Sequence, residues 1–396
     1  MNREDFNILN NNMIYFDNAA TTLKPKVLLN SLSDYYNNYS ANIHRGDYDI
    51  SIKANDMYSL SRKKIADFIN AEFEEIVFTS GTTDSLNKII FGYFKNYLTE
   101  GDEVLLTRAE HASLILPWFE LKEDKKININ YIPLDKEYNV TLENVKKSIT
   151  SNTKVISLAY VTNVIGDVRP MKEIIKYAHD NNILVLIDAA QAIPHKKIDV
   201  KELDCDFLAF SLHKMLGPTG VGVMYGKKNL LECTKPIIFG GGMNASYLEN
   251  GSRVYNDIPY NLEPGTPNIA DVIAISSIVD YLENIGMDKI EQYEKELKKY
   301  AIDKLSLNDN IIIYNKNNDS GIVTFNYKGI FSQDLAIYLN KYNICVRPGN
   351  HCSKILKNEL GVKNTVRVSF YFYNTKEEID RLVEVLNNPN ILNEII

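Results

Sequence analysis

The sequence predicts an α/β protein with a large domain, built on a mainly parallel seven-stranded sheet, and a smaller α+β C-terminal domain. Between residues 74 and 227, short apolar runs alternate with polar, helix-compatible stretches. The runs expected to form the seven strands are EEIVFTS, DEVLLT, ININYIPL, KVISLAYV, ILVLIDAA, DFLAFS and GVGVMYG. After Gly240 the pattern changes, because glycine-rich and polar segments lead into an apolar-periodic helix expected from Ile269 to Ile285.

A helix is expected over residues 52–70, directly before the first strand of the sheet. Small and apolar residues recur there at the three- and four-residue spacing of one helix face. The residues that carry this pattern are Ala54, Met57, Leu60, Ser61, Ile65 and Phe68. We therefore expect this helix to pack on the sheet.

The last third of the chain predicts strands and helices in a less regular order. The expected elements are a strand at 321–327 (GIVTFNY), a helix near Gln333 to Asn340, a strand at 343–347 (NICVR), a strand at 365–374 (TVRVSFYFYN) and a closing helix from Lys376 to Leu386. We therefore divide the chain into a large domain of residues 16–265 and a small domain made of residues 1–15 together with 266–396.

Composition and charge exclude several classes of protein. Of the 396 residues 45% are hydrophobic, enough for one large core or two moderate ones, so the chain is neither disordered nor fibrous. Lys and Arg number 44 against 51 Asp and Glu, and without a basic block we expect no nucleic-acid partner. The start, MNREDFNILNNN, lacks the pattern of a signal peptide, and no apolar run approaches the roughly 18 residues that a membrane span needs. We expect a soluble, cytoplasmic protein without a membrane partner.

Two charged residues follow predicted strands directly. Asp188 ends the run in ILVLIDAAQ, and ligands of open α/β sheets bind beyond the carboxyl ends of strands, although a helix N-cap explains this aspartate equally well. Lys214 follows the next strand, in DFLAFSLHKMLGPTG, together with Ser211 and His213. A lysine desolvated there loses its proton near neutral pH, as Schiff-base chemistry requires, whereas a lone lysine is usually an ordinary surface residue.

Two further segments are expected at strand ends. FTSGTTDSLN places Gly81, Thr82 and Thr83 where backbone amides and hydroxyls can bind a phosphate at a helix N-terminus. LLTRAEHASLILPW carries His111. Each segment alone is a weak indication, because glycine and threonine are common at helix starts and a lone histidine is more often a structural hydrogen-bonding group.

Taken together and in this order, these segments resemble the class V aminotransferase family of pyridoxal-phosphate-dependent enzymes, and within it the SufS-type (group II) cysteine desulfurases. The motifs that carry the resemblance, over nearly the whole chain, are YFDNAATT, ANIHRG, FTSGTT, AEHAS, YVTNVIG, IDAAQ, SLHKMLGPTG, EPGTPN, RPGNHC and VRVSFYFYNT. The resemblance implies that the α/β architecture is the fold-type I fold of pyridoxal-phosphate-dependent transferases. It also implies pyridoxal 5'-phosphate as the cofactor and no metal.

The resemblance implies a role for each residue around that cofactor. Lys214 would bind the cofactor as a Schiff base, Asp188 would pair with the pyridinium nitrogen, Gln191 would hydrogen-bond the phenolic oxygen and His111 would stack on the ring. The implied phosphate contacts are Thr82, Thr83, Ser211 and His213, joined by Thr266 of the partner subunit. The implied substrate contacts are His44, Asn163, Arg347 and Arg367, an arginine being suited to a bidentate clamp on a carboxylate.

Cys352 distinguishes sulfur transfer from transamination. It lies in RPGNHC, a polar loop suited to a mobile nucleophile, where Arg347 and His351 are close enough in sequence to favour a thiolate. In the family such a thiolate takes the sulfur of L-cysteine as a persulfide, releases L-alanine and supplies iron–sulfur cluster assembly through an acceptor protein or thiol. We therefore expect catalytic roles for Lys214, Cys352 and His111, a homodimer, and a sulfur-acceptor protein.

The other three cysteines have no matched role. Cys205, Cys233 and Cys345 lie in or beside predicted strands, and the four cysteines are too sparse for a disulfide framework and form no CxxC pair. We interpret these three as structural.

The chain departs from the family pattern in two places. Ala112 and Ser113 follow His111 where many relatives carry His-Ala-Asn, which alters one side of the predicted pocket. Pro348 and Asn350 stand where relatives commonly have Thr and His. Proline fixes its own φ and restricts the residue before it, so we expect a stiffer loop and a different acceptor.

Two alternative functions remain open. The first keeps the cofactor and changes the reaction, giving a selenocysteine lyase acting on L-selenocysteine, a cysteine-sulfinate desulfinase or another class V lyase or transaminase. The second is a binding protein that keeps the fold and has lost catalysis.

Overall fold

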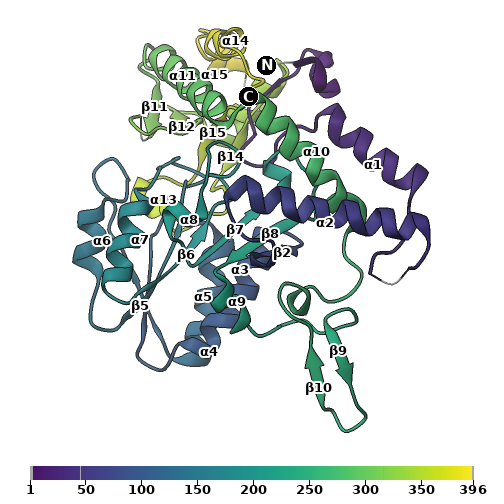
Figure 1. Cartoon of the computed structure of the whole chain (residues 1–396). Helices are drawn as coiled ribbons and strands as arrows, with labels where there is room; N and C mark the ends of the chain where they lie inside the picture. Colours follow the sequence, from purple (N-terminus) through teal and green to yellow (C-terminus); the bar gives the residue numbers. More distant parts are fainter. Residues whose placement is uncertain (1–2, 45, 315, 395–396) are drawn as a thin grey trace.

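Figure 1 shows the computed structural model of the chain, which describes residues 3–44, 46–314 and 316–394. Arg45 of the ANIHRG motif lies outside these residues. A large sheet with helices on both faces fills the lower part of the view, and a smaller sheet with its helices lies above it, close to both chain ends. Within the described ranges, none of the helices combines the length and the apolar character that crossing a bilayer demands.

The helices are α1 (Lys26–Asn38), α2 (Asp49–Ile69), α3 (Thr82–Ile89), α4 (Lys95–Tyr97), α5 (Ala112–Lys125), α6 (Leu142–Ser148), α7 (Met171–Asp180), α8 (Val200–Leu203), α9 (Lys228–Glu232), α10 (Ile269–Ile285), α11 (Met287–Leu305), α12 (Ser332–Asn340), α13 (Leu356–Leu360), α14 (Lys376–Leu386) and α15 (Ile391–Glu394). Shorter helical turns are η1 (Arg3–Asp5), η2 (Asn7–Asn11), η3 (Phe73–Glu75), η4 (Ile90–Phe94), η5 (Leu212–Lys214) and η6 (Tyr260–Leu262).

Among the described residues, the strands form four separate sheets. They are β1 (Ile14–Tyr15), β2 (Ile76–Thr79), β3 (Glu103–Leu106), β4 (Asn128–Tyr131), β5 (Thr153–Ala159), β6 (Leu184–Asp188), β7 (Phe207–Ser211), β8 (Gly222–Gly226), β9 (Asn244–Tyr247), β10 (Arg253–Tyr255), β11 (Ile311–Tyr314), β12 (Ile322–Tyr327), β13 (Ile344–Cys345), β14 (Arg347–Gly349) and β15 (Thr365–Ser369). The hairpin of β9 and β10 projects away from the body of the molecule (Figure 1).

The large sheet has the strand order β2-β8-β7-β6-β5-β3-β4. β8 runs antiparallel to both of its neighbours, and the remaining neighbours are parallel. Each of the seven predicted strands is present among the described residues, so the prediction of a mainly parallel seven-stranded α/β sheet is confirmed. Neighbouring strands are parallel where a helix connects them, because a helical crossover returns the chain to the same end of the sheet.

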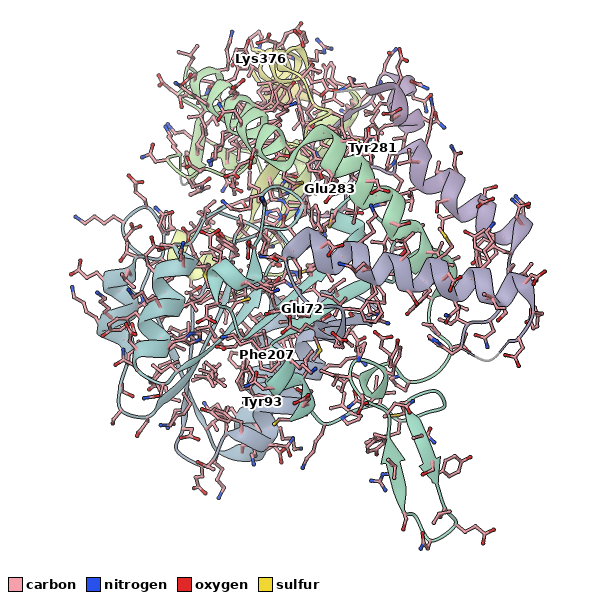
Figure 2. All side chains as sticks on the ribbon, viewed as in Figure 1. Glu72, Tyr93, Phe207, Tyr281, Glu283 and Lys376 are labelled. Carbon is pink, nitrogen blue, oxygen red and sulfur yellow. The ribbon has the colours of Figure 1, made fainter. Side chains whose placement is uncertain are left out.

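Helices cover both faces of this sheet because its strands are apolar on both faces. In β6, Val185 and Ile187 belong to the core under α2, α7 and α10, whereas Leu186 points to the opposite core, under α3 and α5. Tyr93 and Phe207, both labelled in Figure 2, lie in this second core with ring centroids 5.0 Å apart. The predicted helix at 52–70 is α2, which packs along α10.

The C-terminal elements form a second sheet with the order β11-β12-β15-β14. The predicted helices at 269–285 and 376–386 have those same bounds. The predicted strand at 343–347 divides instead into two strands. β13 pairs with β1, whereas β14 joins β15 at the edge of the small sheet. Pro348 is tolerated in an edge strand because a proline has no N–H group to donate to a second neighbour. The predicted strand at 365–374 ends early, at Ser369, and aromatic residues after it turn into the core.

The domain boundary after residue 265 stays a prediction. Helix α10, which follows it, packs in the core of the large sheet, whereas the core under the small sheet takes residues from Leu297 in α11 onward. Helix α11 and β11 were not expected from the sequence, because α11 is strongly charged and β11 is only half-buried.

The parallel strands place their carboxyl ends at one edge of the large sheet. In the register of neighbouring strands, Ala159 pairs with Asp188, Asp188 with Ala209, and Ser211 with Gly222, which also pairs with Thr79. The segments after Thr79, Ala159, Asp188 and Ser211 therefore meet above this edge, facing the small domain.

Candidate active site

A pocket of about 220 Å³ opens where these strand ends meet the small domain. It gathers most of the residues that the sequence analysis singled out. Its lining is Ala19, Ala20, Thr82, Thr83, His111, Ser113, Ala159, Val161, Asn163, Asp188, Ala190, Gln191, Ser211, His213, Lys214, Arg347, His351, Cys352 and Arg367. Residues from eight separate segments of the chain, up to almost 350 positions apart, thus line one cavity.

Lys214 and Asp188 bring opposite charges to the floor of this pocket. Lys214 ends the turn η5 after β7, and Asp188 is the last residue of β6. Burial lowers the pKa of Lys214 to about 8, although the carboxylate of Asp188 opposes that shift. Burial likewise raises the pKa of Asp188, whose Oδ1 accepts a hydrogen bond from Ala190 N at 2.9 Å. With a pKa of about 8, a fraction of the lysine is the neutral amine at physiological pH.

The loop from β2 to α3 forms a cup of polar groups at a helix N-terminus. Thr82 N donates to Ser211 Oγ at 2.7 Å, and the Thr82 hydroxyl contacts the same oxygen at 2.7 Å. Gly222 supports this cup from below, because a Cβ on Gly222 would lie 2.4 Å from the Cα of Gly81. The backbone of β8 thus touches the backbone at the start of α3. The hydroxyl groups of Thr82, Thr83 and Ser211 gather at this helix N-terminus, where an anion is favoured.

His111 caps the N-terminus of α5 and faces the pocket. Its Nδ1 accepts a hydrogen bond from Ser113 N at 3.1 Å, so the proton of the neutral ring lies on Nε2. Burial lowers the pKa of His111 to about 4, and the positive charge of Lys214 adds to this effect. Burial also lowers the pKa of His213 to about 4. Both rings are neutral at physiological pH, and a neutral ring suits stacking on an aromatic ligand.

Ser113 is a pocket residue that the sequence analysis did not assign a role. Its hydroxyl contacts Thr83 Oγ1 at 2.7 Å and His111 Nδ1 at 3.1 Å. Although Ala112-Ser113 departs from the family pattern, this side of the pocket is ordered by hydrogen bonds. Ser113 connects Thr83 at the start of α3 to the ring of His111.

Gln191 has an unused acceptor in the pocket. Its Nε2 donates to Ala19 O at 2.7 Å, which fixes the amide group. Among the described residues nothing donates to its buried Oε1. A buried acceptor without a donor is unfavourable unless a ligand supplies one, so Gln191 indicates a group that enters the pocket.

Arg367 lies on the wall that the small sheet contributes. Its Nη1 donates to Asn163 O at 2.8 Å, and its Nη2 lies 3.0 Å from Asp17 Oδ1. Its Nε is buried without a partner among the described residues. Arg347 stands at the mouth, 3.5 Å from the other carboxylate oxygen of Asp17. One aspartate thus holds two guanidinium groups, and such groups are suited to binding a carboxylate.

Cys352 is exposed at the mouth of the pocket, on a loop that several hydrogen bonds hold in place. Cys352 O accepts from Ala112 N at 2.8 Å, and Cys352 N donates to Asn350 Oδ1 at 3.2 Å. Asn163 donates to His351 O at 2.7 Å and accepts from Ser353 Oγ at 3.0 Å. These bonds tie the loop to α5 and to the segment after β5, as in the stiffer loop that we expected from Pro348, and the mobility of Cys352 stays a prediction.

His351 does not supply the positive charge that the sequence suggested. Its ring is buried, with Nε2 2.9 Å from Thr365 Oγ1. Burial lowers the pKa of His351 to about 3, and the charges of Arg367 and Arg347 act in the same direction. The ring is neutral at physiological pH, and the cation beside the Cys352 loop is Arg347.

A buried ion network lies beneath the pocket. Arg169 Nη1 lies 2.5 Å from Glu110 Oε1, and its Nε lies 3.2 Å from Asp167 Oδ2, all three side chains being almost fully buried. Glu110 Oε2 accepts from Ala159 N at 2.8 Å. The network therefore joins the residue before His111 to the end of β5 and to the loop that carries Asn163. The sequence analysis missed it.

The structure does not bring His44 and Thr266 into this pocket. Both line a second hollow, together with Gly242, Asn256 and Tyr260. His44 stacks edge-on against Tyr58 and Tyr260 there. Within one chain, the position that we expected for His44 beside the substrate is therefore not observed.

The mainly parallel sheet, the lysine after β7, the aspartate at the end of β6 and the polar cup at α3 define a class, the pyridoxal-phosphate-dependent enzymes of fold-type I. The sequence profile of one family, Aminotransferase class-V, matches residues 14–382. The chain belongs to this family.

Relatives within the family are cysteine desulfurases. A protein of Halalkalibacterium halodurans named "Probable cysteine desulfurase" is 43% identical over 94% of this chain and 92% of its own length. A cysteine desulfurase of Thermococcus onnurineus, solved in its apo form, superimposes with a TM-score of 0.92 at 37% identity, over 97% of this chain and 96% of its own. The Escherichia coli cysteine desulfurase CsdA gives a TM-score of 0.93 at 32% identity, over 100% and 98%.

Proposed function

We propose that the chain is a pyridoxal-phosphate-dependent cysteine desulfurase, a sulfurtransferase that converts L-cysteine to L-alanine and keeps the sulfur as a persulfide on Cys352. The observation that carries the proposal is the meeting of Lys214 and Asp188 on the floor of one pocket with Cys352 at its mouth. The cysteine desulfurase relatives described above support it.

The residues present fit the cofactor. Gln191 Oε1, which has no partner among the described residues, would accept a hydrogen bond from the phenolic hydroxyl group. Asp188 would pair with the ring nitrogen, and the neutral ring of His111 would stack on the face of the cofactor ring. Thr82, Thr83, Ser211 and His213 would hold the phosphate, and Lys214 would bind the aldehyde carbon. When bound, pyridoxal phosphate accepts the electrons released at the substrate's alpha carbon.

The chain's own residues then bind the amino acid and move its protons. Arg367, through its free Nε, and Arg347 would hold the substrate carboxylate, with Asn163 beside them. The amine of Lys214, whose pKa is lowered to about 8 by burial, is the base that takes the alpha proton. The same amine returns a proton when the product forms, because it stays on the pocket floor.

Sulfur transfer requires a nucleophile on the protein. The Cys352 thiolate attacks the sulfur of the bound cysteine, an S–S bond forms as the C–S bond of the substrate breaks, and the carbon skeleton takes up protons and leaves as alanine. The balance is L-cysteine plus enzyme thiol giving L-alanine plus enzyme persulfide. A reducing thiol then releases the outer sulfur as sulfide and restores Cys352.

Replacing Cys352 with Ala tests this assignment. We expect alanine release from L-cysteine to fall to background, while release from L-selenocysteine and cysteine sulfinate continues, because these substrates expel their heteroatom without an attacking thiol. Alanine and sulfide are measured in one reaction under a reducing thiol, and wild type should give equal amounts. Cys233→Ala, which removes an exposed thiol outside the pocket, is the matched control.

Other outcomes separate the alternatives. Full activity of Cys352→Ala with L-cysteine would assign the chain to another class V lyase or transaminase. Wild-type activity restricted to selenocysteine or to cysteine sulfinate would assign it to a selenocysteine lyase or a desulfinase. An absorbance spectrum that shows no lysine-bound cofactor after reconstitution would leave a binding protein with this fold.

We also propose that the chain works as a homodimer in which Thr266 of the partner subunit completes the phosphate site, with His44 close to it. Thr266 and His44 share a hollow outside their own chain's pocket. The projecting hairpin of β9 and β10 exposes the apolar side chains of Tyr247, Leu248 and Val254, which suits burial against a second copy (Figure 1). Size-exclusion chromatography with light scattering should give twice the chain mass, and a strict monomer would remove the Thr266 assignment.

The SufS-type (group II) assignment, the sulfur-acceptor protein and a supply of sulfur to iron–sulfur cluster assembly are parts of this proposal. The exposed Cys352 on a fixed loop supports transfer to an acceptor that comes to the loop. Cys205, by contrast, is fully buried, and burial raises its pKa, so that it has no part in transfer.

A further inference from the structure

The motif YFDNAATT carries part of the family resemblance, and its residues Thr21 and Thr22, like Lys24 two positions after it, have no role in the chemistry described above. In the structure it forms a segment from Asp17 to Lys24 that passes between the small domain and the turn η5. Phe16 O accepts a hydrogen bond from Ser369 N at 2.7 Å, and Leu23 N donates to the hydroxyl of Tyr373 at 3.0 Å. The segment is thus anchored to the small domain at both ends.

The middle of this segment converges on one carbonyl group, that of His213, the residue before Lys214. Thr21 Oγ1 donates to His213 O at 3.0 Å, Thr22 N at 3.1 Å and Thr22 Oγ1 at 3.2 Å. The shortest contact comes from Lys24, whose Nζ lies 2.7 Å from the same oxygen. A carbonyl oxygen has two lone pairs, so four donors on it are an unusual concentration, and the ammonium makes the strongest of the bonds.

Thr22 closes the other side of the turn. Leu216 N donates to Thr22 Oγ1 at 2.8 Å, and Leu216 has a left-handed backbone with φ of 61°. The backbone on both sides of Lys214 is therefore tied to the same segment. An unfavourable φ at a non-glycine residue persists only where the surroundings hold it, which is what Thr22 does here.

Lys24 stands behind the pocket, not in its lining. Burial lowers its pKa to about 7, so the chain keeps a lysine where its charge is costly. Its amine faces protein groups, His213 O and the hydroxyl of Thr21 at 3.5 Å. Position and contacts indicate an effect on the turn, not direct contact with a substrate.

We propose that Lys24, together with Thr21 and Thr22, is a positioning residue for Lys214. Lys24 and the two threonines hold the carbonyl group of His213 in place, so that only the side chain of Lys214 moves during turnover. The inference rests on the proposed role of Lys214. Proton transfer by the freed amine depends on its distance from the substrate's alpha carbon, and a displacement of about 1 Å can cost on the order of 100-fold in rate. The hydrogen bonds to His213 O prevent the backbone at Lys214 from shifting by such a distance.

Lys24→Met is the test, because it keeps the length of the side chain and removes the donor. We expect kcat for alanine release from L-cysteine to fall by about 10- to 100-fold with KM unchanged, since the substrate carboxylate site is untouched. The rate at which pyridoxal phosphate attaches to the apoprotein should also fall. This rate is measured by absorbance in the absence of any substrate. Lys24→Arg, which keeps a charged donor, should recover both rates, and Thr21→Val should give a smaller loss of the same kind.

The control is Lys26→Met, an exposed lysine two positions away at the start of α1. Wild-type kcat and attachment rate in Lys24→Met would overturn the proposal. So would a loss in Lys24→Met that tracks a lower unfolding midpoint and is not recovered by Lys24→Arg, because that pattern describes a residue needed only for stability. Attachment is measured without cysteine, so the positioning role is tested even if wild type proves inactive on cysteine.

Discussion

Lys214→Ala is expected to lower kcat for alanine release from L-cysteine by about 10³-fold or more, the scale of a lost general base. Burial lowers the pKa of its amine to about 8, which suits the proposed role of taking and returning a proton near neutral pH. The variant should also lose covalent attachment of the cofactor, which mass spectrometry after borohydride reduction measures directly. The fold should remain, because the side chain ends in an open cavity.

Two controls make this result specific. Lys228→Ala removes an exposed lysine and should behave as wild type. Added methylamine should restore part of the activity of Lys214→Ala, because it supplies the missing amine to the cavity. If the variant kept more than about a tenth of the wild-type kcat, Lys214 would not be the base and the assignment of the pocket floor would be wrong.

Arg169→Met is expected to have the largest effect on stability, a loss of about 3–5 kcal/mol in the free energy of unfolding. Arg169 and its partner Glu110 are fully buried, and removal of the guanidinium leaves Glu110 and Asp167 without a cation in the protein interior. Urea unfolding of the cofactor-free protein measures the change. The loss of a single partner is what makes the change so large, because a buried charge without a counterion is far worse than a buried pair.

The double variant Arg169→Met/Glu110→Gln should recover a substantial part of this loss, since it removes the unpaired charge as well. Arg381→Met serves as the matched control, because Arg381 pairs with Glu384 at the surface and should change the midpoint little. A change of less than about 1 kcal/mol in Arg169→Met would contradict the prediction, because it would show that the buried network contributes little to the free energy of unfolding.

The fold class was predictable because each strand of the large sheet is buried on both faces. Such strands appear in the sequence as short apolar runs, and the runs that end in Asp188 and Ser211 point directly to the strand ends where the pocket lies. Helix α10 was equally clear, since it is apolar almost all round. Helix α11 was not, because its charged residues conceal the few that it buries.

The parts of the site that escaped prediction depend on contacts between distant residues. Arg169 and Glu110 are 59 positions apart, and neither is unusual in its own segment. Lys24 meets His213 across 189 positions. His351 was misjudged for a related reason, because its neighbours in sequence suggest a cation whereas its burial makes the ring neutral. Charge state and pairing follow from three-dimensional burial, which a local pattern does not contain.

The contact between Gly81 and Gly222 limits how this pocket can change. No side chain fits at Gly222 without moving the start of α3, so the anion cup and the lysine strand are joined backbone to backbone. The opposite wall, from Asn163 to Arg367 and the Cys352 loop, is built from side chains on two separate parts of the chain. On that wall a substitution can therefore change the shape of the pocket without displacing the start of α3.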